Sequence, residues 1–232
     1  MGVLVGCGKE IEVVKETQPL TGKLIEEYEV YRDEKSNKPV KHGYYKSYYE
    51  GGSYKEEGNL VDGKQEGKWV LYYESGKVKR EGNFVDGKRD GKWAVYFESG
   101  KVDGEGTYVD GKKEGKRIGY YESGKVKWEK SFVDGKLEGK AVGYYESGKV
   151  QGEKYYHGGT QEGKEVHYYE SGKVFSEDNY VDGKQDGKRV VYYESGQVRG
   201  EGNHVDGKKE GKRVGYYESG KVKWEKSFVD GT

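Results

Sequence analysis

The sequence has few cysteines and no long apolar run, the features that cross-link small proteins or hold a chain in a membrane. Cys7 is the single cysteine, which excludes a disulfide framework within one chain and a zinc site built from several cysteines. No run of apolar residues approaches the ~18 to 20 that a membrane-spanning helix needs. Lysine plus arginine balance aspartate plus glutamate at 42 each, with the two signs interleaved. We therefore expect no nucleic-acid partner, because such binding needs a net basic face.

Apolar residues are also scarce, at 31% of the chain, while 36% of the residues are charged. A large conventional core is not expected from this composition. The chain nevertheless contains 24 Tyr, 4 Trp and 5 Phe, and disordered chains are poor in aromatic residues. The composition therefore predicts a folded protein with a thin aromatic core.

The 40 glycines recur at fixed positions, which reveals an internal repeat. Three glycine series keep the same spacing of 24 residues, one after Glu-Ser, one in Val-Asp-Gly and one four residues after the latter. Residues 115–135 also recur at 211–231 with Ile118 replaced by Val214 as the only change, so four units were duplicated as a block. The first two series are Gly52, Gly76, Gly100, Gly124, Gly148, Gly172, Gly196 and Gly220, and Gly63, Gly87, Gly111, Gly135, Gly159, Gly183, Gly207 and Gly231.

Each repeat predicts a β-hairpin. Lys68 to Glu74 and Val78 to Val85 are rich in β-branched and aromatic residues, and turn sequences bound both segments. Asp-Gly between apolar runs is a strong hairpin signal, because a two-residue turn of type I′ needs positive φ at both positions. We predict an all-β fold, an elongated single-layer antiparallel meander of tandem 24-residue β-hairpin repeats.

The repeats define three segments. Eight tandem repeats occupy residues 41–232, and residues 9–40, which break the period, are expected to form an N-terminal capping hairpin. Residues 1–8 are expected to be a disordered tail or the remnant of a lipoprotein signal, outside the fold. The sequence stops at Thr232 without a cap for the last strand, so either this is a fragment of a longer array, or the uncovered edge invites edge-to-edge self-association.

Alternation along the strands predicts how the two faces differ. Val70 and Tyr72, with their equivalents, are expected to form one uniformly apolar face, and Tyr73 should point to the other face. Glu81 and its equivalents should lie opposite the Val78 and Phe84 positions, beside lysines that screen them.

The segment Gly82-Asn83-Phe84-Val85-Asp86-Gly87-Lys88-Arg89-Asp90-Gly91-Lys92-Trp93 resembles the MORN motif, and with YYESGKVK it resembles the MORN-variant repeats of bacterial YwqK-type proteins. This resemblance covers residue 40 to the end. It implies the hairpin fold, and it implies protein contacts, lipid contacts or scaffolding, with an antitoxin role in toxin–antitoxin systems for the YwqK type. The chain departs from the pattern at Arg117, Glu165, Arg189 and Arg213, where Trp69 and Trp93 stand in other repeats.

The sequence Leu4-Val5-Gly6-Cys7 resembles a bacterial lipobox, which makes Cys7 a candidate lipidation site and membrane tether. Only six residues precede Cys7, without a basic or a full apolar region, so a chance tetrapeptide is the alternative. The first interpretation places the protein in the bacterial cell envelope or outside the cell. The second places it in the cytoplasm.

The sequence contains no catalytic motif and no metal-binding motif, and we expect neither enzymatic activity nor a bound cofactor or metal. Residues that depart from the repeat gather at Tyr155, His157, His167, Phe175 and Asp178, which suggests a partner-binding patch, with a weak metal site at the two histidines as a further possibility. Decay of a tolerant repeat is the alternative explanation. Trp128 and Trp224 are either further partner-binding anchors or residues packed on the sheet.

The leading hypothesis is a non-enzymatic, protein-binding repeat scaffold. One alternative is an antitoxin that neutralises a cognate toxin by direct contact. A second is a peripheral lipid-binding array, although the zero net charge disfavours attachment to anionic lipid.

Overall fold

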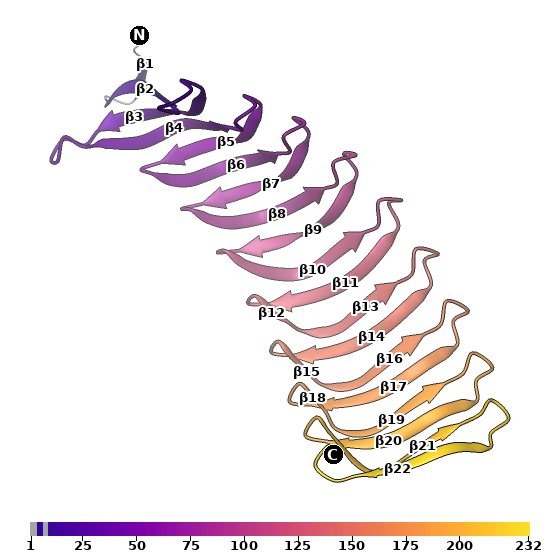
Figure 1. Ribbon diagram of the computed structural model, residues 1–232. Helices are drawn as coiled ribbons and strands as arrows, with labels where there is room; N and C mark the ends of the chain where they lie inside the picture. Colours follow the sequence, from indigo (N-terminus) through magenta and orange to yellow (C-terminus); the bar gives the residue numbers. More distant parts are fainter. Residues whose placement is uncertain (1–3, 7–8) are drawn as a thin grey trace. The chain divides into compact units, whose positions relative to one another are not determined.

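The computed structural model describes residues 4–6 and 9–232, and every regular element in them is a β-strand (Figure 1). The chain divides into two compact units, Met1–Lys113 and Glu114–Thr232. The strands are β1 (Leu4–Gly6), β2 (Lys9–Thr17), β3 (Leu24–Arg32), β4 (Pro39–Tyr48), β5 (Tyr54–Val61), β6 (Lys64–Tyr72), β7 (Val78–Val85), β8 (Lys88–Tyr96), β9 (Val102–Val109), β10 (Lys112–Tyr120), β11 (Val126–Val133), β12 (Lys136–Leu137), β13 (Gly139–Tyr144), β14 (Val150–His157), β15 (Thr160–Gln161), β16 (Gly163–Tyr168), β17 (Val174–Val181), β18 (Lys184–Gln185), β19 (Gly187–Tyr192), β20 (Val198–Val205), β21 (Lys208–Tyr216) and β22 (Val222–Phe228).

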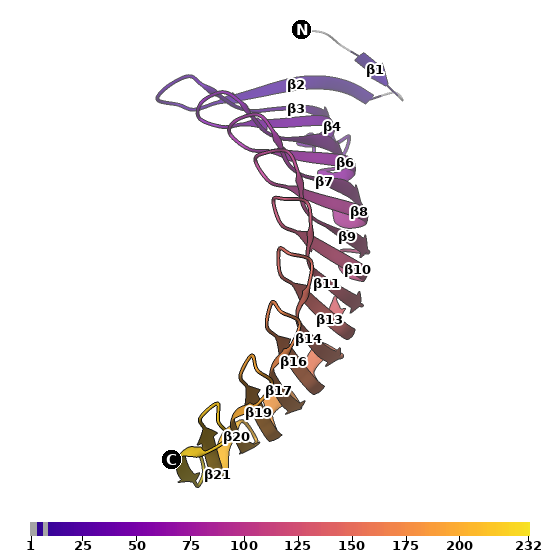
Figure 2. The same cartoon turned by 90° about the vertical axis from the view of Figure 1, so that its right-hand side faces the viewer.

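Within each unit, strands that follow one another in the chain pair antiparallel. Figure 2 shows the strands of each unit following one another in one layer. In the second unit β11, β14 and β17 each pair with an interrupted strand, written β12/β13, β15/β16 and β18/β19. The predicted all-β antiparallel meander of 24-residue hairpins is confirmed. No helix among these residues is long and apolar enough to cross a membrane.

The Asp-Gly turns have the predicted backbone. Asp86 has φ of 51° and Gly87 has φ of 80°, the left-handed values that a type I′ turn requires at both central positions. A third glycine, Gly91 with φ of 69°, lies in the bulge where the β7–β8 register shifts between Gly82 and Asn83. The glycine series thus marks turns and bulges that fix the hairpin register.

One face of the sheet carries a hydrogen-bonded tyrosine, glutamate and lysine in each of several repeats, and we call it the tyrosine face. Glu81 pairs across the ladder with Val70 and accepts a 2.6 Å hydrogen bond from the Tyr96 hydroxyl, while Lys68 Nζ lies 2.8 Å from its other oxygen. Hydrogen bonds from Lys68 and Tyr96 lower the pKa of Glu81. The expectation of a uniformly apolar Val70–Tyr72 face is wrong, because cross-strand register places this carboxylate on it.

The opposite face, which we call the core face, holds the apolar cluster of the first unit. Trp69 and Trp93 are buried, and the Phe84 ring lies edge-to-face against both, with centroids 6.0 and 5.1 Å away. Trp93 covers Gly82, its cross-strand partner, so closely that a Cβ there would lie 2.2 Å from the indole. The cluster comprises Tyr28, Val30, Tyr45, Leu60, Trp69, Phe84, Trp93 and Tyr108, with Val14 packed against it.

Residues 9–40 contain the hairpin β2–β3, and β3 also pairs with β4, the first repeat strand. Leu4–Gly6 form β1, which pairs with β2, so the expected tail at residues 1–8 does not lie wholly outside the sheet. Cys7 lies outside the described residues.

Candidate functional site: two cavities on the core face of the second unit

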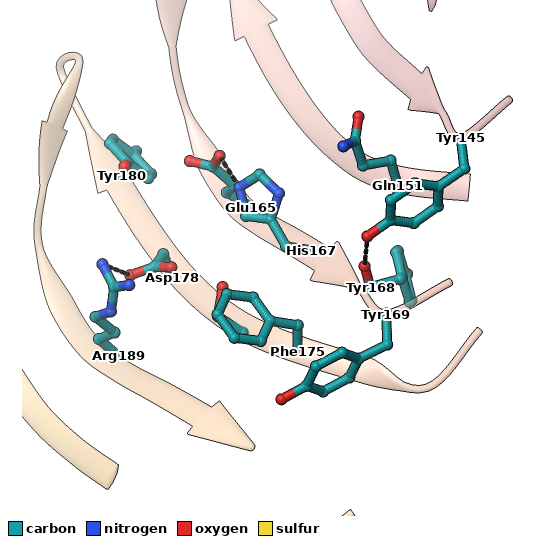
Figure 3. Close-up of a pocket in the computed structure, with 11 residues that line it drawn as sticks. Tyr145, Gln151, Glu165, His167, Tyr168, Tyr169, Phe175, Asp178, Tyr180 and Arg189 are labelled. Atoms are coloured by element: carbon teal, nitrogen blue, oxygen red, sulfur yellow. Dashed lines mark hydrogen bonds and ion pairs between the residues drawn. The ribbon is translucent and has the colours of Figure 1, made fainter. Parts of the chain in front are cut away.

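In the second unit, charged side chains stand at several core-face positions: Glu165 and Arg189 replace the tryptophans of the first unit, and Asp178 replaces Gly82. Glu165 and Asp178 face each other across β16 and β17, and only 4% and 3% of their surfaces are exposed. Ser176 is 1% exposed and lies opposite His167 in the same pair of strands. These buried polar residues belong to the candidate site, and Figure 3 shows Glu165, His167 and Asp178 among them.

Each of the two carboxylates is paired with one cationic side chain and one side-chain amide from the same or a neighbouring strand. Lys154 Nζ lies 2.9 Å from Glu165, and Arg189 lies 3.4 Å from Asp178. The side-chain amide of Gln161 donates to Glu165 at 2.8 Å, and that of Gln185 donates to Asp178. Buried carboxylates directly opposite each other would repel, so these partners are what makes the arrangement stable.

His167 is a third hydrogen-bond partner of Glu165, with its Nε2 2.6 Å from the carboxylate. Burial alone would raise the pKa of Glu165, but hydrogen bonds from His167, Lys154 and Gln161 outweigh it and lower the pKa to about 2. Glu165 is therefore a fixed negative charge at neutral pH.

Two glycines lie near these carboxylates on the core face. Gly143 and Gly152 are cross-strand partners in β13 and β14, with Trp128 beside Gly143 and His167 beside Gly152 on the neighbouring strands. The His167 imidazole lies over Gly152, where a Cβ would be 2.8 Å from its Nδ1, whereas a Cβ at Gly143 would meet no atom closer than 3.8 Å, so the space over Gly143 stays open.

Two cavities result, and both are lined by Gln151 and His167. The polar cavity, of about 500 Å³, is lined by Tyr145, Gln151, Glu165, His167, Tyr168, Tyr169, Phe175, Ser176, Asp178, Tyr180 and Arg189. The Trp128 cavity, of about 450 Å³, is lined by Tyr121, Lys127, Trp128, Lys130, Ala141, Val142, Gly143, Gln151, Gly152, Lys154, Tyr156 and His167. Both are open at the surface of one unit.

Aromatic rings border the polar cavity near the Glu-Ser-Gly turns. Phe175 packs edge-to-face on Tyr169, with ring centroids 5.2 Å apart and planes at 80°. The Tyr145 hydroxyl donates to the Tyr168 carbonyl at 2.6 Å, and Tyr169 makes the equivalent bond to Tyr192 one repeat later. Backbone carbonyls therefore fix the positions of these two rings.

The structure brings together three of the predicted partner-binding residues. His167 and Phe175 line the polar cavity, and Trp128 and His167 line the Trp128 cavity. Trp128 also covers Gly119, as Trp224 covers Gly215, so both indoles pack on the sheet. Trp224 is 43% exposed and lines neither cavity.

Tyr155 and His157 are on the other side of the sheet. In β14, Gly152 pairs with His167 on the core face, so Tyr155 and His157, at odd spacing from it, point to the tyrosine face. His157 contacts Glu138 at 3.1 Å there. The suggested shared metal site of His157 and His167 is therefore wrong, and no group of three metal-ligating side chains occurs within residues 4–6 and 9–232.

The sequence did not single out Ser176 or Gln151, and it noted Glu165, Asp178 and Arg189 only as departures from their repeat positions. The available signal was the replacement of Trp69 and Trp93 by charged residues at equivalent positions. The sequence alone did not reveal the strand register, which places Glu165 opposite Asp178.

Comparison with known proteins identifies the repeat. A family model described as MORN repeat variant matches residues 41–62, 65–86, 89–110, 113–134, 137–157, 161–182, 185–206 and 209–230. No curated protein matches the chain.

Two solved structures show only remote similarity. A crystal structure of TcdB2-TccC3-Cdc42 shares 10% identity over 96% of this chain with a TM-score of 0.21, and this chain spans only 16% of that one. A porin-like protein from Bacteroides uniformis ATCC 8492 shares 9% identity over 94% of this chain and 93% of its own, with a TM-score of 0.23. At such TM-scores neither likeness bears on fold or function.

Proposed function

Because this chain belongs to the MORN repeat variant family, we propose that it is a non-enzymatic scaffold that binds a segment of another protein in the polar and Trp128 cavities. The observation that supports this most is the pair of cavities on one face, with Gln151 and His167 in both linings. Open hollows with aromatic borders and a few fixed polar groups are typical of binding sites.

The state of Glu165 favours binding over catalysis. A general base must be able to accept a proton near neutral pH, and donors from Lys154, Gln161 and His167 hold the pKa of Glu165 at about 2. Asp178 is likewise engaged by Arg189 and Gln185. Both carboxylates thus serve as positioned charges.

The proposal is tested by selecting random displayed peptides on the immobilised chain and titrating the enriched peptides against it in solution. Gly143→Phe fills the Trp128 cavity, since the nearest heavy atom to a Cβ at Gly143 is 3.8 Å away. We expect about a tenfold loss of affinity in this variant. Tyr155→Ala, on the tyrosine face, is the matched control and should bind like the wild type.

Two outcomes would overturn the proposal. One is that no peptide is enriched over the bare support. The other is that Gly143→Phe leaves the affinity unchanged while Tyr155→Ala abolishes it, which would move binding to the opposite face.

We further propose that the protein is of the YwqK type and that the bound segment belongs to a protein of the cell envelope, with the chain tethered through Cys7. The support is the YYESGKVK half-repeat and the lipobox-like Leu4-Val5-Gly6-Cys7. Intact mass and membrane fractionation after expression from the native upstream start test the tether. An unmodified, soluble chain would instead favour a cytoplasmic antitoxin, to be tested by co-expression with the neighbouring gene product.

Attachment to anionic lipid is the third candidate. The zero net charge speaks against it, and salt-sensitive binding to anionic vesicles would support it.

A further inference from the structure

In four repeats, the chain places one of its own cations over the tyrosine that directly precedes the Glu-Ser-Gly turn. The cation comes from the residue six positions later, at the start of the next strand. The pairs are Lys79 over Tyr73 at 5.4 Å, Lys127 over Tyr121 at 5.4 Å, Arg199 over Tyr193 at 5.8 Å and Lys223 over Tyr217 at 5.3 Å from the ring centroid. These are cation–π distances, so each ring face is satisfied from within the chain.

The two repeats that border the polar cavity lack this cation. Gln151 stands six residues after Tyr145, and Phe175 stands six residues after Tyr169. Phe175 packs on Tyr169 in place of a cation. In the part of the chain that the structure describes, no Lys or Arg lies over the Tyr145 ring, so a cation site that other repeats fill internally is left open beside the cavity.

The rings that border the cavity suit a positive charge. The two carboxylates of the lining, Glu165 and Asp178, are already paired with Lys154 and Arg189, so the attraction for a further cation comes from the ring faces. The rings of Tyr145, Tyr169 and Phe175 offer π faces and apolar surface for an aliphatic stem. Figure 3 shows Tyr145 and Gln151 on one side of His167 and Glu165, with Phe175 and Tyr169 along the adjacent border.

We propose that the polar cavity binds a lysine or arginine side chain of the partner protein, whose cation lies over Tyr145 where other repeats place their own lysine or arginine. This inference rests on the proposed function and specifies its chemistry. The aliphatic stem of the bound side chain packs against Phe175, and its charge is held by the π face of Tyr145.

The chain's own repeats supply the variants for the test. Gln151→Lys introduces the residue that stands at the equivalent positions 79, 127 and 223, so the variant carries a substitution that the fold already accepts. It should place an internal cation over Tyr145 and exclude the ligand. Gln151→Leu is the matched control, because it changes the same position without adding a charge.

The probes are flexible Gly-Ser peptides with one Lys or one Arg, and the same peptides with acetyl-lysine or citrulline. Titration of the ¹⁵N-labelled full chain, followed by amide chemical shifts, reports both affinity and location. We expect shifts around Tyr145, Gln151 and Phe175 for the charged peptides, and affinity at least about fivefold weaker for the neutral ones. Gln151→Lys should weaken the charged peptides by a similar factor, and Gln151→Leu should not.

Lys79→Gln is the control in the first unit. It removes the cation from Tyr73, which lines neither cavity, so binding at the polar cavity should stay unchanged. The inference is overturned if neutral and charged peptides bind equally, or if Gln151→Lys binds as well as Gln151→Leu. Displayed peptides that lack Lys and Arg but lose affinity with Gly143→Phe would sink this inference and leave the proposed function standing.

Discussion

At the scale of single residues, glycine and tryptophan act as cross-strand pairs. Trp93 lies over Gly82 in the adjacent strand, and Trp69 lies over Gly58 in the same way. The glycine lets a large ring lie against the backbone, which buries the indole in a sheet that has only one layer. The absence of a side chain at Gly82 is therefore a packing requirement.

Gly82→Ala should destabilise the first unit by on the order of 2 kcal/mol, because the added methyl lies within the indole of Trp93 and forces it away. A red shift of tryptophan emission and a lower urea midpoint would report the displaced ring. Gly143→Ala is the control, since its Cβ meets no atom closer than 3.8 Å. Equal losses in the two variants would contradict this explanation.

The buried carboxylate of Glu165 should make stability depend on pH. Its pKa lies at about 2 in the folded protein against the usual 4.5, so its contribution is fully present above about pH 4.5 and is lost as the pH falls towards 2. Glu165→Gln should lower the free energy of unfolding at pH 7 by on the order of 3 kcal/mol, with the difference from wild type shrinking towards pH 2. Urea titrations at several pH values measure this difference.

Glu153→Gln is the matched control for that experiment. Glu153 is also paired with a lysine, Lys140, at 2.8 Å, but it lies on the tyrosine face and is more exposed than Glu165. Glu153→Gln should lower the free energy of unfolding by less than Glu165→Gln does, and it should change the fall in stability at acid pH by less. A pH-independent difference between Glu165→Gln and the wild type would contradict the role assigned to Glu165.

At the scale of the element, the hairpin is set by its turn. Asp86 and Gly87 both have positive φ, and the Gly87 amide donates to the Gln65 carbonyl of the preceding hairpin at 2.9 Å. The turn therefore joins its own two strands and also contacts the preceding turn. Glu66 adds a side-chain acceptor for the Asp86 amide at 2.9 Å.

Gly87→Ala should destabilise the protein by roughly 1 to 2 kcal/mol, because an L side chain is strained at φ of 80°. Urea unfolding followed by circular dichroism measures the loss. Asp86→Asn is the control, because asparagine tolerates the left-handed backbone and loses only an exposed contact to Lys64. A larger loss for Asp86→Asn than for Gly87→Ala would show that the contact, and not the backbone, determines the turn.

At the scale of the whole molecule, the repeat is the unit of stability. Strands pair with their sequence neighbours in each unit, so each hairpin depends on the hairpins before and after it. Such nearest-neighbour arrays gain stability in roughly equal steps per repeat.

Deletion of residues 78–101, one complete repeat, should leave a folded β protein with a lower urea midpoint, because Lys77 then joins Val102 as it joined Val78. Deletion of residues 78–89 should abolish cooperative unfolding, because it removes one strand and leaves its partner unpaired on one side. Circular dichroism and size-exclusion chromatography distinguish the two. Loss of structure in the complete-repeat deletion would contradict nearest-neighbour stability.

Much of the architecture could be predicted from the sequence, because its signals are local. Asp-Gly turns, 24-residue spacing and β-rich segments each act within one hairpin, and together they predicted the antiparallel meander. The faces were harder. Alternation along one strand does not say which residue of the next strand lies opposite, and the register pairs Glu81 with Val70, on a face that was expected to be apolar.

The candidate site could be predicted only in part. His167, Phe175 and Trp128 stood out as departures from the repeat, and the structure brings them to the two cavities. Tyr155 and His157 departed equally but point to the opposite face, since neighbours in a strand alternate sides.

By itself the sequence determined the repeat length, the hairpin, the turn chemistry and the family, because these depend on residues close together in the chain. Only the tertiary structure decided that Glu165 faces Asp178, that Gly143 leaves a hollow between Trp128 and His167, and that Tyr145 lacks a cation. The physical reason is register. Which side chains meet across two strands depends on the bulges and turns of both, and a charge is buried or exposed according to what its cross-strand neighbours leave open.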